Sequence, residues 1–256
     1  MTASVSVGNP GAVHAEVRHV PALQALEWLN RGWDDVVKIG SSGLAHGALI
    51  AILGAVLLML GSTHMYLTAA AVTGYLLVGP VMTTGLCELA RRREARESLS
   101  FDDSLQAISR NPEALMHFGG VLALIAILWF VLSAMLLESV LSAPVPSLAV
   151  ALWGGSSLLT PSQLLGYIAA GGVLAAVVFA VSVVSVPLII DRHASAPDAI
   201  RASLRATFAN LPVMFVWALL IVGLTAIGFL TLLVGMVVVA PLLGYATWHA
   251  YRDLIA

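Results

Sequence analysis

Charged residues are scarce in this sequence. Only 10% of its 256 residues are Asp, Glu, Lys or Arg, whereas 59% are apolar. Together with a mean hydropathy of +0.95, this balance lies outside the range of soluble globular domains. The chain has more apolar surface than a soluble core of its size can bury, so it needs a lipid bilayer around it.

Residues that carry cofactor chemistry are equally sparse. The single cysteine, Cys87, excludes an intrachain disulfide. The sequence contains no His-x-x-x-His pair, no Cys-x-x-Cys and no HExxH, so no local ligand set for a metal or haem is specified. It also has no phosphate-binding loop and no basic face for nucleic acid. We therefore expect no metal, no cofactor, no nucleic-acid partner and no catalytic residue.

Four windows of the sequence contain no charged residue at all: 39–87, 114–137, 139–190 and 206–251. A helix rises about 1.5 Å per residue, so crossing a hydrocarbon core of roughly 30 Å takes about 20 residues. The first and last windows are long enough for two helices each, with turns expected near 61–64 and 223–228.

The other two windows fit one helix each, because the third begins with several turn-forming Pro and Gly residues. The sequence therefore predicts an all-α integral membrane bundle of six transmembrane helices, at about 43–60, 65–88, 114–137, 164–190, 211–227 and 229–251.

All twelve Lys and Arg residues fall on one side of this predicted bundle. By the positive-inside rule that side is cytoplasmic, and both termini lie there. The first 38 residues have no short apolar core of the kind found in a removable signal peptide. We expect residues 1–20 to form a loose tail and residues 21–256 to form a single transmembrane domain.

The chain also shows signs of an internal repeat. Amphipathic stretches at 23–38, 101–110 and 200–208 precede three of the membrane helices and predict short helices in the membrane interface. The second membrane helix of each following pair carries one proline near its charged end. The fold is thus predicted as three quasi-repeated units of interfacial helix plus helical hairpin. The alternative, that membrane helices simply tolerate proline and end in charges, has equal weight.

Polar residues follow these prolines and form a candidate cytoplasmic-rim cluster: Glu88, Arg91, Asp191, Arg192, His249 and Arg252. No ionisable residue lies in the middle of a predicted membrane helix, which argues against ion-coupled transport.

Small residues and prolines form a second set, predicted to pack helices together: Gly40, Gly47, Gly54, Gly61, Pro80, Pro187 and Pro241. The four glycines recur every seven residues and therefore share one helix face, where small residues let another helix approach closely. Packing inside the chain is favoured over a homodimer seam. Three tryptophans are predicted to anchor the chain at headgroup depth: Trp28, Trp33 and Trp248.

Several segments together resemble a family of uncharacterised bacterial integral membrane proteins, a domain of unknown function (DUF2189-like). The matching residues are Trp28-Leu29 with Gly32-Trp33 and Asp35, Gly79-Pro80 with Gly85-Leu86 and Glu88, Ser185-Val186-Pro187 with Asp191-Arg192, and Gly244 with 247–252. The resemblance implies a multi-helix protein of the bacterial inner membrane and supplies no active-site residue.

Three functions stay open at this point. The first is a non-enzymatic subunit, assembly factor or scaffold, whose partners are the lipid bilayer and another membrane protein complex or a second copy of the chain. The second is a transporter or channel for neutral or lipid-like solutes. The third is an interfacial enzyme that uses Glu88, Asp191 and His249.

Overall fold

The computed structural model describes residues 16–61, 75, 79–140 and 160–256. Within these residues the secondary structure is helical, apart from one isolated bridge between Val17 and Ile255. The prediction of an all-α chain is therefore confirmed for this part of the sequence. Its helices are α1 (Gln24–Ile39), α2 (Ser41–Gly61), α4 (Thr84–Glu94), α5 (Phe101–Arg110), α6 (Pro112–Val140), α8 (Pro161–Ser182), α9 (Ser185–Arg192), α10 (Ala196–Ala209), α11 (Leu211–Leu230) and α12 (Met236–Leu254).

Four stretches of the described residues are long and apolar enough to cross a membrane: Ser41–Met59, Pro112–Ser133, Pro161–Arg192 and Leu211–Leu230. They match four of the six predicted membrane helices. The predicted helix 65–88 lies largely outside the described residues. α12, which takes the place of the predicted helix 229–251, is not among the four, and its last turns carry polar and charged side chains. The six-helix count and the threefold repeat are thus not confirmed.

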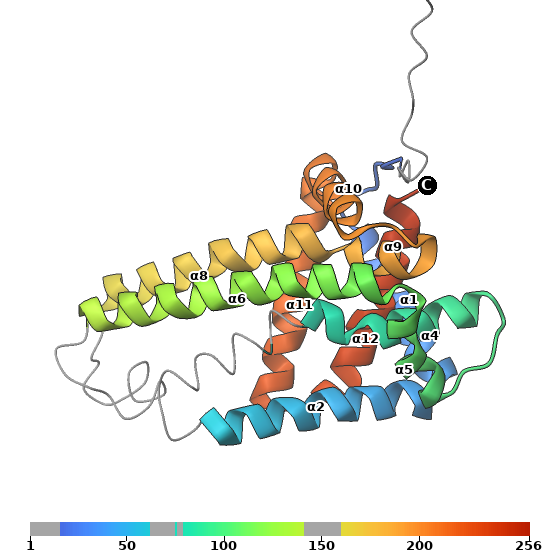
Figure 1. Cartoon of the computed structure of the whole chain (residues 1–256), viewed down its shortest axis with the longest axis horizontal. Helices are drawn as coiled ribbons and strands as arrows, with labels where there is room; N and C mark the ends of the chain where they lie inside the picture. The colour runs from blue at the N-terminus through green and yellow to red at the C-terminus, as the bar shows by residue number, and fades with distance from the viewer. Residues whose placement is uncertain (1–15, 62–74, 76–78, 141–159) are drawn as a thin grey trace, which may run out of the picture.

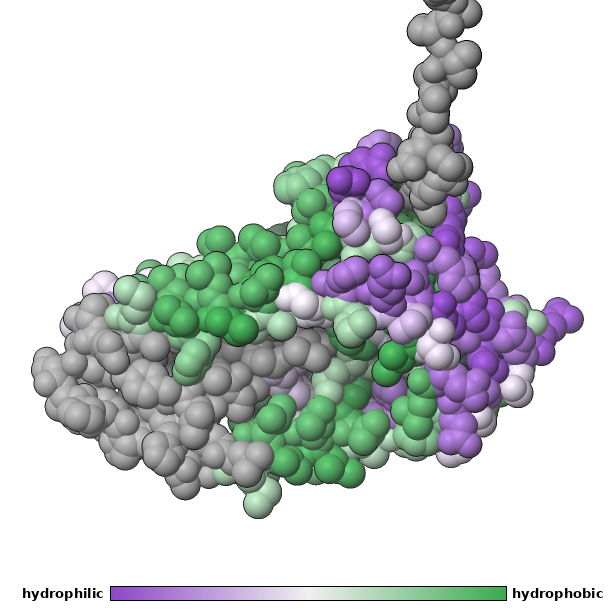
Figure 2. Space-filling view, viewed as in Figure 1, coloured by the Kyte–Doolittle hydropathy of each residue, from purple (hydrophilic) through white to green (hydrophobic). Residues whose placement is uncertain are grey.

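The long helices occupy one part of the molecule and the short ones another. In Figure 1, α6 and α8 run side by side, α2 runs along the opposite side, and α11 and α12 run obliquely to all three. The short helices α1, α4, α5 and α9 gather at one end together with the last turns of α12. We call this region the polar end, because Figure 2 shows hydrophilic residues gathered there and hydrophobic residues covering the long helices.

All three amphipathic stretches form the predicted short helices, as α1, α5 and α10. α5 begins with a capping box, in which Ser100 Oγ accepts a hydrogen bond from the backbone N–H of Asp103 and the Asp103 carboxylate accepts one from Ser100 N–H. α10 begins with Ser195 in the same capping role toward Asp198 N–H. The polar residues before each apolar pattern therefore determine where these two helices start.

Glycines in α2 allow α12 to pack closely against it. A Cβ atom on Gly47 would lie 2.3 Å from the carbonyl oxygen of Val237 and 2.8 Å from Cδ of Pro241, and a Cβ on Gly54 would lie 2.8 Å from the Tyr75 ring. Both residues thus lie at close contacts within the chain.

The two outer members of the predicted glycine stripe have other positions. Gly40 is not on the α2 face; it ends α1 with a φ of +65°, a conformation that glycine adopts without steric cost. Gly61 is the last residue of α2.

The predicted helix 164–190 is divided in two, because α8 ends at Ser182 and α9 begins at Ser185. Ser203 of α10 lies at this break: its hydroxyl donates to the carbonyl oxygen of Ala180 at 2.7 Å and accepts from Val184 N–H at 3.4 Å. Pro187 lies in the first turn of α9, where its missing N–H costs no helical hydrogen bond.

The other two prolines differ in their surroundings. Pro241 is buried inside α12, against Gly47. Pro80 is half-buried, and its carbonyl oxygen accepts a hydrogen bond from Thr83 Oγ1 at 2.9 Å.

The turn of the last hairpin lies later than predicted. α11 runs through Gly223 and Gly228 to Leu230, and the turn occupies residues 231–235. Glycine is tolerated inside an apolar membrane helix, so its presence did not mark the end of this one. Gly228 has a packing role instead, because a Cβ there would lie 2.3 Å from the sulfur of Met236 at the start of α12.

The first described residues are held in place, which corrects the prediction of a loose tail for residues 16–20. Arg18 N–H donates to the carbonyl oxygen of Leu254 at 2.9 Å, and Ala256 N–H donates to that of Glu16 at 2.9 Å. The side chain of Asn210 accepts from Val20 N–H and donates to the Arg18 carbonyl, both at 3.0 Å. The rest of the predicted tail, 1–15, lies outside the described residues.

Candidate functional site at the polar end

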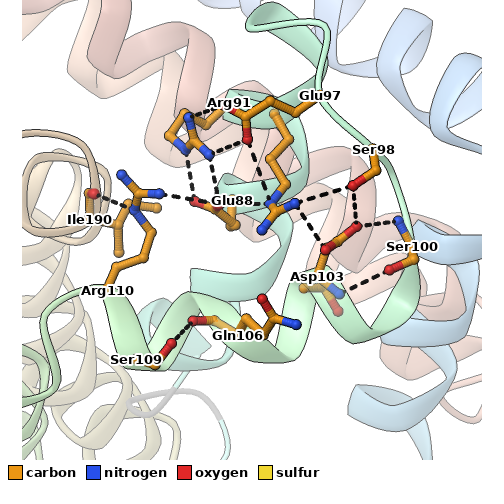
Figure 3. A network of polar contacts seen from close by, with 12 residues as sticks. Glu88, Arg91, Glu97, Ser98, Ser100, Asp103, Gln106, Ser109, Arg110 and Ile190 are labelled. Atoms are coloured by element: carbon orange, nitrogen blue, oxygen red, sulfur yellow. Dashed lines mark hydrogen bonds and ion pairs between the residues drawn. The ribbon is translucent and has the colours of Figure 1, made fainter.

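Glu88 is the centre of the largest charged network. Its side chain is only 1% exposed and binds three arginines. Arg91 donates to both carboxylate oxygens at 2.9 Å, Arg92 Nε donates to one of them at 2.9 Å, and Arg110 lies 3.6 Å away (Figure 3). Two of these arginines follow Glu88 by three and four residues on α4, the spacing at which helical side chains meet. Arg110 comes from the end of α5.

Further carboxylates balance the arginines around Glu88. Arg91 also donates to Glu97 at 2.8 Å, and Arg92 forms an ion pair with Asp103 at 2.9 Å. The hydrogen bond with Glu88 raises the pKa of Arg91, and the hydrogen bond from Arg91 lowers the pKa of Glu97. The pKa of Asp103 is lowered first by its hydrogen bonds with Ser100.

The network also reaches α9. Arg110 Nε donates to the carbonyl oxygen of Ile190 at 2.9 Å (Figure 3). Three guanidinium groups and three carboxylates thus join α4, α5 and α9, and their formal charges cancel.

A second buried carboxylate, Asp35, comes from the C-terminal part of α1. It is 1% exposed, forms an ion pair with Arg93 of α4 and lies 2.8 Å from Nε2 of His249 on α12. The sequence did not mark Asp35 as a buried charge. The signal that could have found it is the spacing of Trp28, Gly32 and Asp35, which places all three on one face; that face is buried against α12.

Asp253 joins the two ends of the described chain. Its carboxylate accepts hydrogen bonds from Trp28 Nε1 at 2.8 Å and Gln24 Nε2 at 2.9 Å, and it forms an ion pair with Arg31. Burial acts to raise the pKa of Asp253, but the hydrogen bonds from Arg31, Gln24 and Trp28 outweigh burial, so the pKa lies below its ordinary value. No sequence motif had singled out this residue.

The remaining candidate residues bind aromatic side chains of α12 or carboxylates near them. The Tyr251 hydroxyl donates to Asp191 at 2.6 Å and accepts from Arg192 Nε at 3.1 Å. Glu94 accepts from Trp248 Nε1 at 3.0 Å and from Arg252 at 2.9 Å. These contacts attach both α9 and α4 to the last turns of α12.

The structure therefore places all six predicted rim residues at the polar end but distributes them among separate networks. Glu88 and Arg91 bind each other, Asp191 and Arg192 share Tyr251, His249 binds Asp35, and Arg252 binds Glu94. Within the described residues, no hydrogen bond or ion pair joins Glu88, Asp191 and His249 directly to one another. Their contacts hold helices together rather than converge on a common point.

Two of the three predicted tryptophan anchors are wrong. Trp28 and Trp248 are 0% and 1% exposed, so their indole rings cannot reach lipid headgroups. Each donates its N–H to a carboxylate, and Trp28 also packs edge-on against Trp217 with ring centroids 5.9 Å apart. Trp33 is half exposed, as an interfacial anchor requires. Both indole N–H groups are therefore used in hydrogen bonds to carboxylates within the protein.

Comparison with known proteins places part of the chain in a family. Residues 67–191 match the family model described as "Predicted integral membrane protein (DUF2189)". This segment, just under half of the chain, is similar to the DUF2189 family. The matched segment contains Glu88, its three arginine partners and Asp191, whereas α1, α11 and α12 lie outside it. No curated protein and no solved structure matches the chain.

The DUF2189 assignment agrees with the four apolar helices described above. The chain is an integral membrane protein whose family model names no activity. Among the described residues, no three His, Cys, Asp or Glu side chains are grouped so that they could hold a metal ion.

Proposed function

We propose that this DUF2189 protein is a non-catalytic scaffold of the bacterial inner membrane, acting as an accessory subunit or assembly factor for another membrane protein. One observation carries the proposal. The buried carboxylates of the polar end are paired with arginines of their own and of other helices, whereas short helices beside them present apolar side chains outward. Such a rim is rigid and suited to contact rather than to proton transfer.

α1 supplies the clearest contact face. Leu26, Trp33 and Val37 are 49%, 51% and 65% exposed and lie seven and four residues apart, so they form one stripe along the helix. The stripe points away from the α1 face that packs on α12. Exposed aromatic and aliphatic side chains next to charges are typical of surfaces that bind another protein.

α5 adds a second apolar face to the polar end. Leu105 and Ile108 are three residues apart and 45% and 59% exposed. Together with the α1 stripe they give the polar end two apolar surfaces. We name these five residues, Leu26, Trp33, Val37, Leu105 and Ile108, the rim surface.

The orientation is part of the proposal. The first and last described residues bind each other through backbone hydrogen bonds, which supports placing both on one side of the membrane. The positive-inside rule assigns that side to the cytoplasm, because the polar end carries the arginines and lysines.

Site-specific photocrosslinking in native membranes tests the proposal. A photoreactive amino acid is placed at Trp33, Val37 or Ile108 of the rim surface, and at Leu124 or Leu128 of α6 as controls that are similarly exposed but belong to an apolar membrane helix. We expect the rim positions to form discrete adducts with one protein and the α6 positions to form lipid adducts. A monomeric protein whose rim positions react only with lipid or water would overturn the proposal. The transporter and interfacial-enzyme alternatives stay untested hypotheses.

A further inference from the structure

The turn between α11 and α12 exposes large apolar side chains. Leu230, Leu232 and Val234 are 83%, 86% and 72% exposed, and no charged residue occurs between positions 206 and 251. Leu232 and Leu233 adopt positive φ angles of 53° and 67°, where glycine or asparagine is the usual choice. Leucine at these positions keeps the turn apolar, with Leu232 pointing outward and Leu233 buried at 3% exposure.

The backbone N–H groups of this turn all have acceptors close by in the chain. Every N–H from residue 231 to residue 239 donates to an acceptor within 227–235. The donors and acceptors are Thr231 to Ile227, Leu232 to Phe229, Leu233 to Gly228, Val234 to Thr231, Gly235 to the Thr231 hydroxyl, Met236 to Leu233, Val237 to Val234, and Val238 and Val239 to Gly235. The Thr231 hydroxyl itself donates to carbonyl oxygens of α11. A water-exposed turn does not need every N–H group to be paired within the protein, but a turn in hydrocarbon does.

The depth of the turn in the bilayer can be judged from the residues of α2 that lie beside it. A Cβ atom on Gly54 would lie 3.1 Å from Cδ1 of Leu233, so the turn lies beside Gly54. The membrane-spanning stretch of α2 continues to Met59, five residues further, which corresponds to about 7 Å. The turn therefore lies at a depth that α2 still crosses as an apolar helix.

The length of α12 also indicates that the turn lies inside the hydrocarbon core. From Trp248, whose indole binds Glu94 at the polar end, to Gly235 in the turn is about 13 residues, or roughly 20 Å. This is shorter than a hydrocarbon core of roughly 30 Å. α11 is longer, at 20 residues, but both helices run obliquely to α2, α6 and α8 in Figure 1.

We infer that α11 and α12 form a re-entrant hairpin, whose turn at residues 231–235 contacts lipid acyl chains inside the bilayer instead of emerging on the far side. Among the described residues, α2, α6 and the α8–α9 pair then cross the membrane. With the one further crossing that the sequence alone predicts at 65–88, the re-entrant hairpin returns the chain to the side from which it started. The arrangement keeps all arginines and lysines on one side, as the positive-inside rule requires.

Nitroxide labelling of single cysteines in phosphatidylcholine–phosphatidylglycerol vesicles tests the inference. Cys87 is replaced by Ala, and cysteine is introduced at Leu232 or Val234 in the turn. Leu124→Cys on α6 is the hydrocarbon control and Asp102→Cys on α5 is the aqueous control; both native side chains are exposed. Collision of the label with molecular oxygen and with a water-soluble nickel chelate is measured by electron paramagnetic resonance.

We expect both turn labels to resemble the Leu124 label, with oxygen collision several-fold more frequent than nickel collision. A turn label that collides with nickel as often as the Asp102 label would overturn the inference, because the turn would then reach water. Low collision with both reagents would overturn it as well, since a protein surface would cover the turn. Two turn positions are used so that a folding defect in one variant leaves the other to decide.

Discussion

The polar end and the oblique hairpin of α11 and α12 are held to the rest of the protein by different forces. At the polar end, the buried Glu88 and Asp35 and the half-buried Asp253 are paired with cations or N–H donors from neighbouring helices. Where α12 meets α2, the contacts are between Gly47 and Pro241 and between Gly54 and Leu233. In a bilayer, burial of apolar surface does not drive helices together, because lipid is as apolar as the side chains. In this region, close shape complementarity between the helices has to hold them together instead.

α4 contributes charged side chains to several polar networks at once. Glu88 binds Arg110 of α5, Arg93 binds Asp35 of α1, and Glu94 binds Trp248 of α12. A helix of 11 residues therefore joins three others through charges. Such networks are strongly directional, whereas the glycine contacts tolerate any apolar neighbour of the right shape. Substitutions in the two regions should consequently destabilise the protein for different reasons.

The largest loss of thermal stability is expected from Glu88→Gln. The substitution leaves Arg91, Arg92 and Arg110 without their shared buried anion, and removing one member of a buried ion pair costs about 3–5 kcal/mol. Glu97→Gln is the matched control, because Glu97 also binds Arg91 but its side chain is 42% exposed. Thermal unfolding in detergent should show a large loss for Glu88→Gln and little change for Glu97→Gln. Equal melting temperatures for the two variants would contradict a central role of Glu88.

Gly47→Leu tests the close packing of α2 against α12. The added side chain would meet backbone of α12 at Val237 and the ring of Pro241, and forcing extra atoms into a packed contact costs about 1–3 kcal/mol. Gly172→Leu in α8 is the control, since a Cβ there meets nothing within 4 Å. Size-exclusion chromatography after heating should show earlier loss of the monodisperse peak for Gly47→Leu alone. If Gly172→Leu behaved the same way, α2–α12 packing would not be the cause.

Ser203→Ala should have an intermediate effect at the break between α8 and α9. It removes the hydroxyl that bonds the Ala180 carbonyl and the Val184 N–H, and a buried polar group left without a partner costs about 1–3 kcal/mol. The exposed Ser109 serves as control, because Ser109→Ala loses only a local bond to Gln106. Hydrogen exchange at residues 180–186 should become faster in Ser203→Ala and stay unchanged in Ser109→Ala.

The smallest change in melting temperature is expected when the pH is lowered. The pKa of Asp253 is lowered from its ordinary 3.8 in the folded protein, so its contribution to stability is present above that value and is lost as the pH falls through the folded pKa. Glu97 and Asp103 shift in the same direction. The melting temperature should hold between pH 7 and about 5 and drop below pH 4. Asp253→Asn should lie below wild type at pH 7, and the gap should narrow on acidification. A constant gap would exclude titration of Asp253 as the cause.

Much of the secondary structure was predictable from the sequence. The charge-free windows predicted α2, α6, α8 and α11, and the amphipathic stretches predicted α1, α5 and α10, because helix-forming patterns are local. The boundaries were less certain where local signals have two meanings. Glycines near 223–228 suggested a turn, yet Gly228 lies inside α11 because its lack of a side chain serves contact with Met236.

The pairing of charged side chains could not be predicted. Trp28 and Trp248 were predicted to be lipid anchors, because nothing in the local sequence shows that their indoles will meet the carboxylates of Asp253 and Glu94. Those pairs join residues more than 150 positions apart in the chain. Such contacts depend on the approach of α1, α4 and α12, which is a property of the whole fold.

The sequence by itself determined that the chain is a helical membrane protein whose charges lie outside its long apolar runs. Hydrocarbon excludes charge and unpaired backbone groups, so long charge-free runs specify helices in a bilayer without further information. The tertiary structure decided which charges neutralise one another, that the six rim residues belong to separate networks, and that the last hairpin runs obliquely with a closed, apolar turn. These features depend on distances between helices that are remote in sequence, and those distances are set only when the helices pack.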